Sequence, residues 1–286
     1  MKILDGKHLS SLILEELKIE TKAFIEKENI VPTIAVILVS DDPASATYVK
    51  TKKKRASEIG FKNIDYKLSA DIKEDELVAL IEELNNDDSV HAILVQLPLP
   101  KHINKDRIIN TIDYKKDVDG FTLLNVGRLA LAKDCFIPCT PKGIVALLEY
   151  YKIETEGKRV CVIGRSNIVG QPIATILMQS PYNATVTVCN SKTKDLPSIT
   201  KTSDIIIVAA GVQNILTQDM INEDAVIIDV GINRIIRDGK SRLVGDVAHI
   251  DNCQAITPVP GGVGPMTIAC LMQNTLKAAK GLKWNI

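Results

Sequence analysis

The residues of this chain that could do chemistry begin with Tyr48 and Lys52, four positions apart in ATYVKTKKKRASEIGF, residues 46–61. At about 100° per residue, a helix over this segment places Val49 and Ile59 on one apolar sector, and Lys52 falls inside it. A lysine on an apolar stripe must extend its charge to water, pair with another group, or lose its proton. Two interpretations stay open: a lysine stem beside a solvated basic face, or an amine available for chemistry near neutral pH.

Composition limits the class of protein. The chain has 286 residues, enough for two domains, and 35 basic residues balance 35 acidic ones, so we expect no nucleic-acid partner. Six cysteines occur without a CxxC pair, which predicts reduced core thiols and no metal site. The start MKILDGKHLS lacks a signal-peptide pattern and no apolar run is long enough to span a bilayer, so we expect a cytoplasmic protein with no membrane partner.

Short apolar runs alternate with helical patterns along the chain, which is typical of parallel α/β sheets. The first series predicts strands over residues 32–40, 63–68 and 91–100 and helices around Lys52 and over 74–86. The second series predicts strands over 159–164, 184–189, 204–210 and 225–230, with helices over 141–151, 170–179 and from 265 onward. The predicted fold is α/β with two αβα domains, the second a Rossmann-like doubly wound parallel sheet, and a cleft between them.

KKDVDGF, residues 115–121, contains two aspartates before a glycine. A calcium loop of the EF-hand type starting at Asp117 needs a glutamate at its twelfth position, where this chain has Arg128, so we expect no metal there. The segment is then either a plain turn or a site where Asp119 meets N–H groups of a substrate. Gln96, at the end of a predicted strand, is similarly open between a structural and a binding role.

VCVIGRSNIVGQP, residues 160–172, places Gly164 at a strand end and Gly170 at a helix start. Glycines at these positions let the backbone approach a pyrophosphate, and Arg165 and Ser166 add phosphate ligands. The spacing is not GxGxxG, so an ordinary βα turn stays an alternative.

The next strand end bears on cofactor choice. After Cys189 the chain reads Asn190-Ser191-Lys192-Thr193-Lys194, with no acidic residue before Asp195. Because NAD sites usually place a carboxylate on the ribose 2′-hydroxyl, this loop favours NADP, with a solvated polar loop as the alternative.

TPVPGGVGPMT, residues 257–267, combines fixed prolines with glycines that add no bulk. Such a loop is rigid and can lie against a flat ring.

Taken in order, seven motifs carry a family resemblance: Tyr-x3-Lys at 48–52, LVQLPLP, KDVDG, PCTP, GRSNIVGQP, DVGIN and TPVPGGVGPMT. The chain resembles, over essentially its whole length, the bifunctional methylenetetrahydrofolate dehydrogenase/methenyltetrahydrofolate cyclohydrolase enzymes, the FolD family. The resemblance implies a folate-binding catalytic domain over residues 1–140, completed by a helix over 265–286, and an NADP-binding domain over 141–264.

The resemblance also implies residue roles. Lys52 is implied as the catalytic lysine, assisted by Tyr48 and Gln96, with Asp119 gripping the pterin. The folate side is implied to include Val95, Gln96, Leu97, Pro260, Gly261, Gly262, Val263 and Gly264. NADP is implied to contact Gly164, Arg165, Ser166, Ser191, Ile232 and Thr267. Asn190 stands where the family commonly has histidine, which leaves the strength of the NADP preference open.

The implied activity is oxidation of 5,10-methylenetetrahydrofolate with NADP, followed by hydrolysis of the methenyl product to 10-formyltetrahydrofolate, in a homodimer. An NAD-preferring or monofunctional dehydrogenase is the alternative, and a non-enzymatic nucleotide-binding protein is a third possibility.

Overall fold

The computed structural model describes residues 1–39, 43–237 and 240–281, and this chain divides into two compact units. The three-stranded unit comprises Ser11–Cys139 and the segment from Ile268 onward, and the six-stranded unit comprises Met1–Ser10 and Thr140–Thr267. Position 40 of the first predicted strand and positions 282–286 of the predicted last helical segment lie outside the described residues.

The three-stranded unit is a β-α-β-α-β series. Its elements are α1 (Gly6–Glu28), β2 (Thr33–Val39), α2 (Pro43–Glu58), β3 (Lys62–Leu68), α3 (Glu74–Asn86), β4 (Ala92–Val95), α4 (Lys105–Thr111) and α5 (Leu123–Ala130). The strands form a parallel sheet in the order β3-β2-β4, with β2 in the middle. Residue 37 of β2 pairs with residue 95 of β4, so β2 and β4 end close together.

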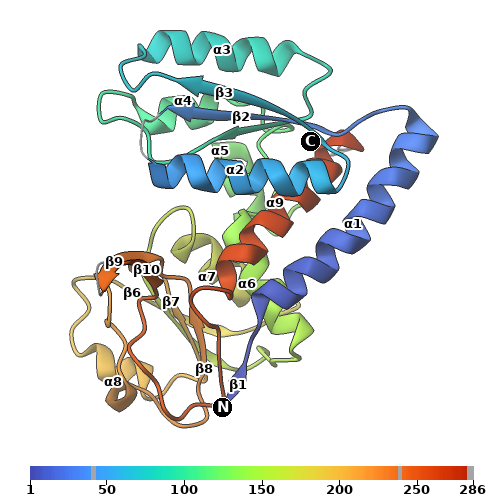
Figure 1. Cartoon of the computed structure of the whole chain (residues 1–286). Coiled ribbons are helices and arrows are strands. Elements are labelled where there is room, and N and C mark those ends of the chain that lie inside the picture. Colours follow the sequence, from blue (N-terminus) through green and yellow to red (C-terminus); the bar gives the residue numbers. More distant parts are fainter. Residues whose placement is uncertain (40–42, 238–239, 282–286) are drawn as a thin grey trace. The chain divides into compact units, whose positions relative to one another are not determined.

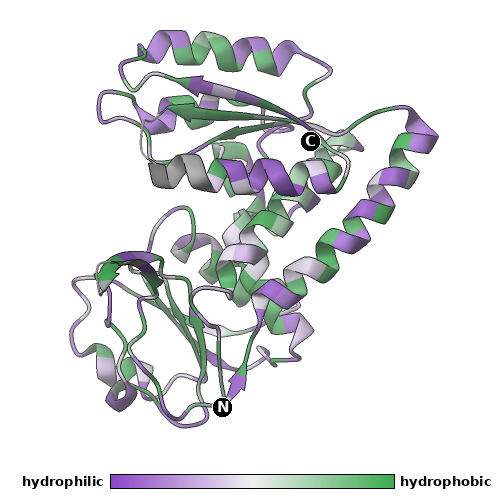
Figure 2. Cartoon of the chain, viewed as in Figure 1, coloured by the Kyte–Doolittle hydropathy of each residue, from purple (hydrophilic) through white to green (hydrophobic). Residues whose placement is uncertain are grey.

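Both faces of this sheet are covered, so every residue of β2 is buried and all but Thr33 are apolar. Ile34 and Val36 point into a core shared with α2 and the C-terminal helix, whereas Ala35 and Ile37 point into a core shared with α3 and α4. Figure 1 shows α2 and α3 on opposite sides of the sheet. Strand β2 is coloured hydrophobic in Figure 2, while the second half of α2 is mainly hydrophilic.

The six-stranded unit is a parallel sheet in the order β1-β11-β8-β7-β5-β6. Its strands are β1 (Lys2–Ile3), β5 (Arg159–Ile163), β6 (Thr185–Cys189), β7 (Ile205–Val208), β8 (Val226–Asp229) and β11 (Ala255–Ile256). Its other elements are α6 (Cys139–Tyr150), α7 (Gly170–Met178), α8 (Leu196–Thr200), the short helix η1 (Gln218–Met220), the antiparallel hairpin β9 (Asn233–Arg237) and β10 (Lys240–Val244), and the first turn of α9 (Val263–Ala279).

Two helices continue from one unit into the other: α1 starts in the six-stranded unit, and so does α9. The structure differs from the predicted division at the N-terminus, because Met1–Ser10 belongs to the six-stranded unit. The reason is that β1 pairs with β11 through Lys2 and Ala255, and Lys7 N donates to Gly261 O at 2.7 Å.

The predicted α/β fold with parallel sheets is confirmed. The predicted strand over 91–100 is shorter in the structure and ends at Val95. Within the described part of the chain, no helix is long and apolar enough to cross a membrane.

Candidate active site and cofactor edge

Lys52 lies on the inward face of α2, and its side chain is only 6 % exposed. Its Nζ donates a hydrogen bond to Gln96 Oε1 at 3.0 Å and stands 4.7 Å from the centre of the Tyr48 ring. Gln96 follows β4 directly, and its own amide donates to Leu97 O at 2.8 Å. The helix therefore presents the amine to the carboxyl end of the sheet, where β4 presents the glutamine.

Burial decides the charge state of this group. Desolvation lowers the pKa of the Lys52 amine, although the nearby Asp119 carboxylate and Cys139 thiol oppose the shift. Burial likewise raises the pKa of the Tyr48 phenol, which keeps it protonated. The shift moves the amine toward the neutral form, which can accept a proton from a bound group.

Asp119 lies on a tight turn between α4 and α5, and its carboxylate acts on the Lys52 charge. Burial raises the pKa of its carboxyl, while the Lys52 charge opposes the shift. Asp117, by contrast, is fully engaged within the protein: its Oδ2 accepts from Thr122 N and from Asn125 Nδ2, both at 2.8 Å. The two aspartates of KKDVDGF thus differ, because Asp117 holds the turn and Asp119 faces the lysine.

The four predicted catalytic residues, Tyr48, Lys52, Gln96 and Asp119, come together in the three-stranded unit. Val95 ends β4 as a buried residue, and Gln96 N donates to Ile37 O at 2.8 Å. Residues 95–97 therefore lie at the sheet edge beside Lys52.

The six-stranded unit has its own edge at the ends of β5 and β6. Gly164 has φ +118°, and a Cβ there would lie 2.1 Å from Ala209 O, so only glycine fits. A Cβ on Gly170 would lie 2.2 Å from Gly164 O, which means that the two glycines pack against each other. The Gly-x5-Gly spacing thus closes the βα turn tightly against the sheet.

Ser166 completes this turn, since its Oγ accepts from Val169 N at 3.2 Å and Gly170 N at 3.4 Å. Arg165 lies in the same turn and is exposed to solvent. The turn therefore leaves a cation at the edge where a phosphate group would sit.

The loop after β6 lies beside this turn, because Gly164 N donates to Cys189 O at 2.9 Å. Asn190 Oδ1 accepts from Lys192 N at 2.9 Å, and Thr193 Oγ1 accepts from Asn190 N at 2.8 Å. The asparagine thus folds its own loop and leaves Ser191 exposed toward solvent. Ser191 and Arg165 follow the paired strands β6 and β5, and no acidic residue occurs in the loop of residues 190–194. An exposed hydroxyl and a cation at neighbouring strand ends fit a 2′-phosphate better than a free ribose hydroxyl.

The other predicted binding residues of the six-stranded unit surround the TPVPGGVGPMT loop. A Cβ on Gly264 would lie 4.0 Å from the Ile232 side chain, and Ile232 is 60 % exposed. Gly262 is buried against the chain start, where a Cβ on Gly6 would lie 1.9 Å from Gly262 O. Thr267 Oγ1 and Thr140 Oγ1 are 3.0 Å apart and share a hydrogen bond. Of residues 260–264, Gly264 therefore lies beside Ile232, and Gly262 lies against the start of the chain.

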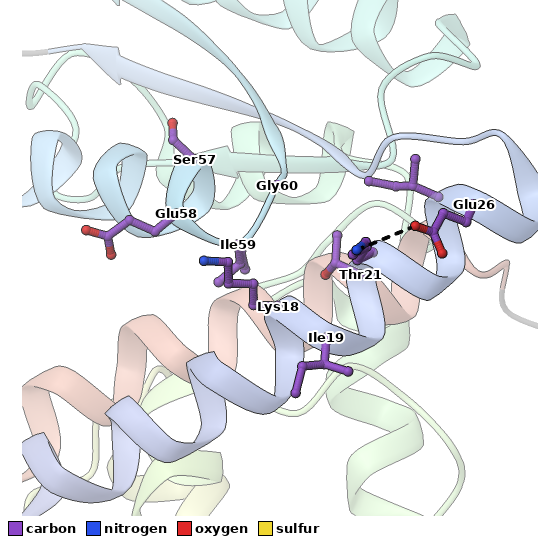
Figure 3. Close-up of a pocket in the computed structure, with 10 residues that line it drawn as sticks. Lys18, Ile19, Thr21, Glu26, Ser57, Glu58, Ile59 and Gly60 are labelled. Carbon is purple, nitrogen blue, oxygen red and sulfur yellow. Dashed lines mark ion pairs between the residues drawn. The ribbon is translucent and has the colours of Figure 1, made fainter.

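A separate pocket of the three-stranded unit lies between α1 and the end of α2 (Figure 3). Its lining includes Lys18, Ile19 and Ile59, and Lys22 Nζ lies 3.8 Å from Glu26 Oε1. None of the predicted catalytic residues lines it, so it is distinct from the Lys52 cluster, by which we mean Tyr48, Lys52, Gln96 and Asp119.

Comparison with known proteins decides the family. Residues 4–119 match the catalytic domain of the tetrahydrofolate dehydrogenase/cyclohydrolase family, and residues 138–283 match its NAD(P)-binding domain. The chain belongs to the tetrahydrofolate dehydrogenase/cyclohydrolase family. It is 54 % identical over 284 residues to the bifunctional protein FolD of Campylobacter jejuni strain RM1221, covering 98 % of this chain and 99 % of that protein.

Solved structures of this tetrahydrofolate dehydrogenase/cyclohydrolase family agree with the fold. The bifunctional FolD enzyme of Campylobacter jejuni superposes with a TM-score of 0.92 at 53 % identity, covering 98 % of this chain and 99 % of that one. The FolD enzyme of Trypanosoma brucei, solved with NADP and an inhibitor, gives a TM-score of 0.93 at 36 % identity, covering 97 % of each chain.

The structure also shows two buried aspartates, Asp229 and Asp246, that the sequence analysis did not identify. Asp246 Oδ2 accepts from Ala210 N at 2.8 Å and Gly211 N at 2.7 Å, and its Oδ1 accepts from Asn233 Nδ2 at 2.8 Å. Asp229 Oδ1 accepts from Gly231 N at 2.9 Å and Asp246 N at 3.0 Å. The pair therefore ties together the loops after β7, β8 and β10.

A signal for this pair was present in the sequence, because Asp229 lies two positions before a glycine in DVG and Asp246 directly follows a glycine in GDV. A Cβ on Gly245 would lie 1.8 Å from Asp229 Oδ2, and one on Gly231 would lie 2.3 Å from Asp246 Oδ1. The glycines make room for the carboxylates, but the pairing across 17 positions is visible only in the fold.

Proposed function

We propose that this chain oxidises 5,10-methylenetetrahydrofolate to 5,10-methenyltetrahydrofolate with NADP and hydrolyses that product to 10-formyltetrahydrofolate. The observation that carries the proposal is the buried Lys52 amine held by Gln96 Oε1 at 3.0 Å, in a chain that belongs to the tetrahydrofolate dehydrogenase/cyclohydrolase family. The relatives that bear the name bifunctional protein FolD match it over nearly their full length.

The hydrolytic step makes direct use of the Lys52 cluster. The methenyl carbon is a cationic electrophile, so water adds to it and must lose a proton as the new C–O bond forms. The neutral Lys52 amine accepts that proton. As the C–N5 bond breaks, the ammonium returns a proton to N5, and the hydroxyl of the adduct releases its proton to solvent as the formyl C=O forms. Gln96 orients the amine through its hydrogen bond, and the Tyr48 ring at 4.7 Å stabilises the ammonium while it exists.

In this proposal Asp119 binds N–H groups of the pterin, and the folate side extends over residues 95–97 and 260–264. Residues 95–97 support this role because they end β4 beside Lys52. Two conditions favour a neutral amine in the complex, namely burial and the positive charge of the methenyl product.

The residues at the ends of β5 and β6 fit NADP. Bound there, NADP supplies the acceptor for the hydride that leaves the methylene carbon. We assign Arg165 and Ser191 to the 2′-phosphate, Gly164 and Ser166 to the pyrophosphate, and Ile232 and Thr267 to the remainder of the cofactor. Exposure of Arg165 and Ser191 at neighbouring strand ends supports this assignment.

The direct test follows the methenyl absorbance after purified protein is mixed with 5,10-methylenetetrahydrofolate and either NADP or NAD. We expect the band to rise and then decay with NADP, and to rise more slowly with NAD. No band with either cofactor would refute the dehydrogenase, and a band that persists would refute the hydrolase.

Cofactor preference has its own test. Arg165→Ala should lower kcat/KM for NADP by about tenfold or more and change the value for NAD far less, since only NADP carries the 2′-phosphate. Lys201→Ala, exposed just after α8 and outside the loop of residues 190–194, is the matched control. Equal losses of kcat/KM with both cofactors would contradict the assignment of Arg165 to the 2′-phosphate.

The proposal also includes a homodimer in the cytoplasm. All six cysteines are buried, as expected for core thiols in a reducing compartment, and the homodimer rests on the family resemblance. Sedimentation of the purified protein tests the assembly, and cell fractionation tests the location.

A further inference from the structure

The turn that carries Asp119 is clamped on its N-terminal side by β4. Ile93 N donates to Lys116 O at 2.8 Å, and residues 93 and 117 form a parallel bridge. Gly120 closes the turn with φ +71°, and a Cβ there would lie 2.3 Å from Phe136 O. The backbone around Asp119 therefore packs directly against the segment that leads to Cys139.

Asn274 joins these two segments from the C-terminal helix. Its Nδ2 donates to Val118 O at 2.8 Å and to Ile137 O at 3.0 Å, and the side chain is only 1 % exposed. Both acceptors are carbonyls, so the nitrogen of the amide must face them. The thiol of Cys139 adds a second donor to Val118 O at 3.4 Å.

The two segments that Asn274 bridges carry the two groups that act on the lysine charge, Asp119 and Cys139. The bridged carbonyl of Val118 belongs to the residue directly before Asp119. A shift of this carbonyl would move the carboxylate relative to the amine, and a misplacement of about 1 Å can cost as much as 100-fold in rate.

We propose that Asn274 is a positioning residue that holds the Asp119 carboxylate beside the Lys52 amine. It acts through the backbone of Val118 and does not need to touch the substrate. In its kinetic form the inference rests on the proposed hydrolase function, whereas the geometry itself concerns only groups of this chain.

The first test is a double-mutant cycle on methenyltetrahydrofolate hydrolysis. Asn274→Ala should lower kcat/KM by about 10- to 100-fold in the wild-type background. In the Asp119→Asn background the same change should cost less than about threefold, because the group that it positions is already gone. An equal loss in both backgrounds would overturn the proposal.

The matched control is Thr275→Val on the same helix. Thr275 is fully buried, and its Oγ1 donates to Leu271 O at 2.9 Å within the helix. This variant removes a buried side-chain hydrogen bond without touching the Asp119 turn, so its kcat/KM should stay within about twofold of wild type. A loss as large as that of Asn274→Ala would assign the effect to helix packing.

The second test reads the lysine itself and needs no activity. The titratable groups that face Lys52 are Tyr48 on its own helix, Asp119 on the turn and Cys139 at the start of α6. With ¹³C-labelled lysine, the Lys52 NMR signal should titrate at lower pH in Asn274→Ala than in wild type, and in the same direction in Asp119→Asn. An unchanged titration in a folded Asn274→Ala protein would contradict the proposal.

Asn274→Ser covers the case in which the alanine variant does not fold, because its shorter side chain keeps one polar donor. The same direction of shift is expected, at smaller size. If wild-type protein fails to hydrolyse the methenyl compound, the proposed function fails, while the lysine titration still decides the role of Asn274.

Discussion

Lys52 and Asp246 are both buried charges at the carboxyl edge of a parallel sheet, but they are partnered differently. Asp246, with 0 % exposure, accepts hydrogen bonds from two backbone N–H groups and from Asn233. Lys52, with 6 % exposure, donates to Gln96 and otherwise faces an aromatic ring and a carboxylate whose own pKa is raised.

The difference separates a structural charge from a reactive one. An acceptor such as Asp246 gains stability from each donor that it satisfies, and the loops that supply those donors become fixed. An amine with spare donors in an apolar setting is costly for the fold, and its protonation responds to any charge that a ligand introduces. We expect removal of the first to damage stability and removal of the second to damage activity.

The largest expected effect is on hydrolysis. Lys52→Met should lower the rate of methenyltetrahydrofolate hydrolysis by about 1,000-fold or more, because it removes the group that we propose as the proton acceptor. NADP affinity, measured by calorimetry, should stay near the wild-type value. Lys50→Met is the control, since Lys50 is exposed on the opposite side of α2. Retained hydrolysis in Lys52→Met would mean that Lys52 is not the reactive group in this comparison with Asp246.

The next effect is on stability. Asp246→Ala leaves two backbone N–H groups and the Asn233 amide without their acceptor, so the free energy of unfolding should fall by about 3 kcal/mol. Denaturant unfolding measures it, with the exposed Asp224→Ala as a control that should change stability by no more than about 0.5 kcal/mol. A loss no larger than that of the control would mean that Asp246 is not structural.

A smaller effect comes from the space around the carboxylates. In Gly245→Ala the new methyl would lie 1.8 Å from Asp229 Oδ2, so stability should fall by about 1 to 3 kcal/mol. Gly127→Ala on α5 is matched, because no atom lies within 4 Å of its added Cβ, and it should be neutral or stabilising by about 0.5 to 1 kcal/mol. Thermal unfolding of the pair gives the contrast, and equal shifts would argue against a crowded carboxylate.

The smallest effect is a pH dependence of stability. Burial holds the pKa of Lys52 below its ordinary 10.5, so the unfolded chain binds the extra proton between the folded pKa and 10.5. The cost of folding this group is full below the folded pKa and is relieved as the pH rises toward 10.5. Wild-type protein should therefore gain stability relative to Lys52→Met between about pH 7 and pH 9.5.

Urea unfolding of both proteins at the two pH values measures this gain. The same comparison with Lys50→Met should show no such trend, and a constant difference for Lys52→Met would mean that the amine keeps its ordinary pKa.

Much of this architecture was predictable because its signals are local. The apolar run over 33–39 and the helical sector around Lys52 depend on near neighbours, and both reappear in β2 and α2. The placement of Lys52 on the inward face followed from helical spacing alone. Its role in catalysis is still a proposal.

The features that were not predictable are non-local or short. β1 consists of two exposed residues, Lys2 and Ile3, which form no strand pattern. The sequence therefore does not predict the pairing of β1 with β11, about 250 positions later. The hairpin of β9 and β10 and the bond between Asp229 and Asp246 likewise depend on segments that meet only after folding. Asn274 gave no sequence signal, because a buried amide on an apolar helix has no periodic pattern of its own.

The last helix has a consequence for how this protein is made. Cys270, Leu271, Met272 and Leu276 fill the same core as β2, and Asn274 reaches the Asp119 turn from among them. During synthesis this core therefore stays incomplete until the residues of α9 have been added, about 230 positions after β2. Folding of the three-stranded unit thus depends on a contact between segments far apart in the chain.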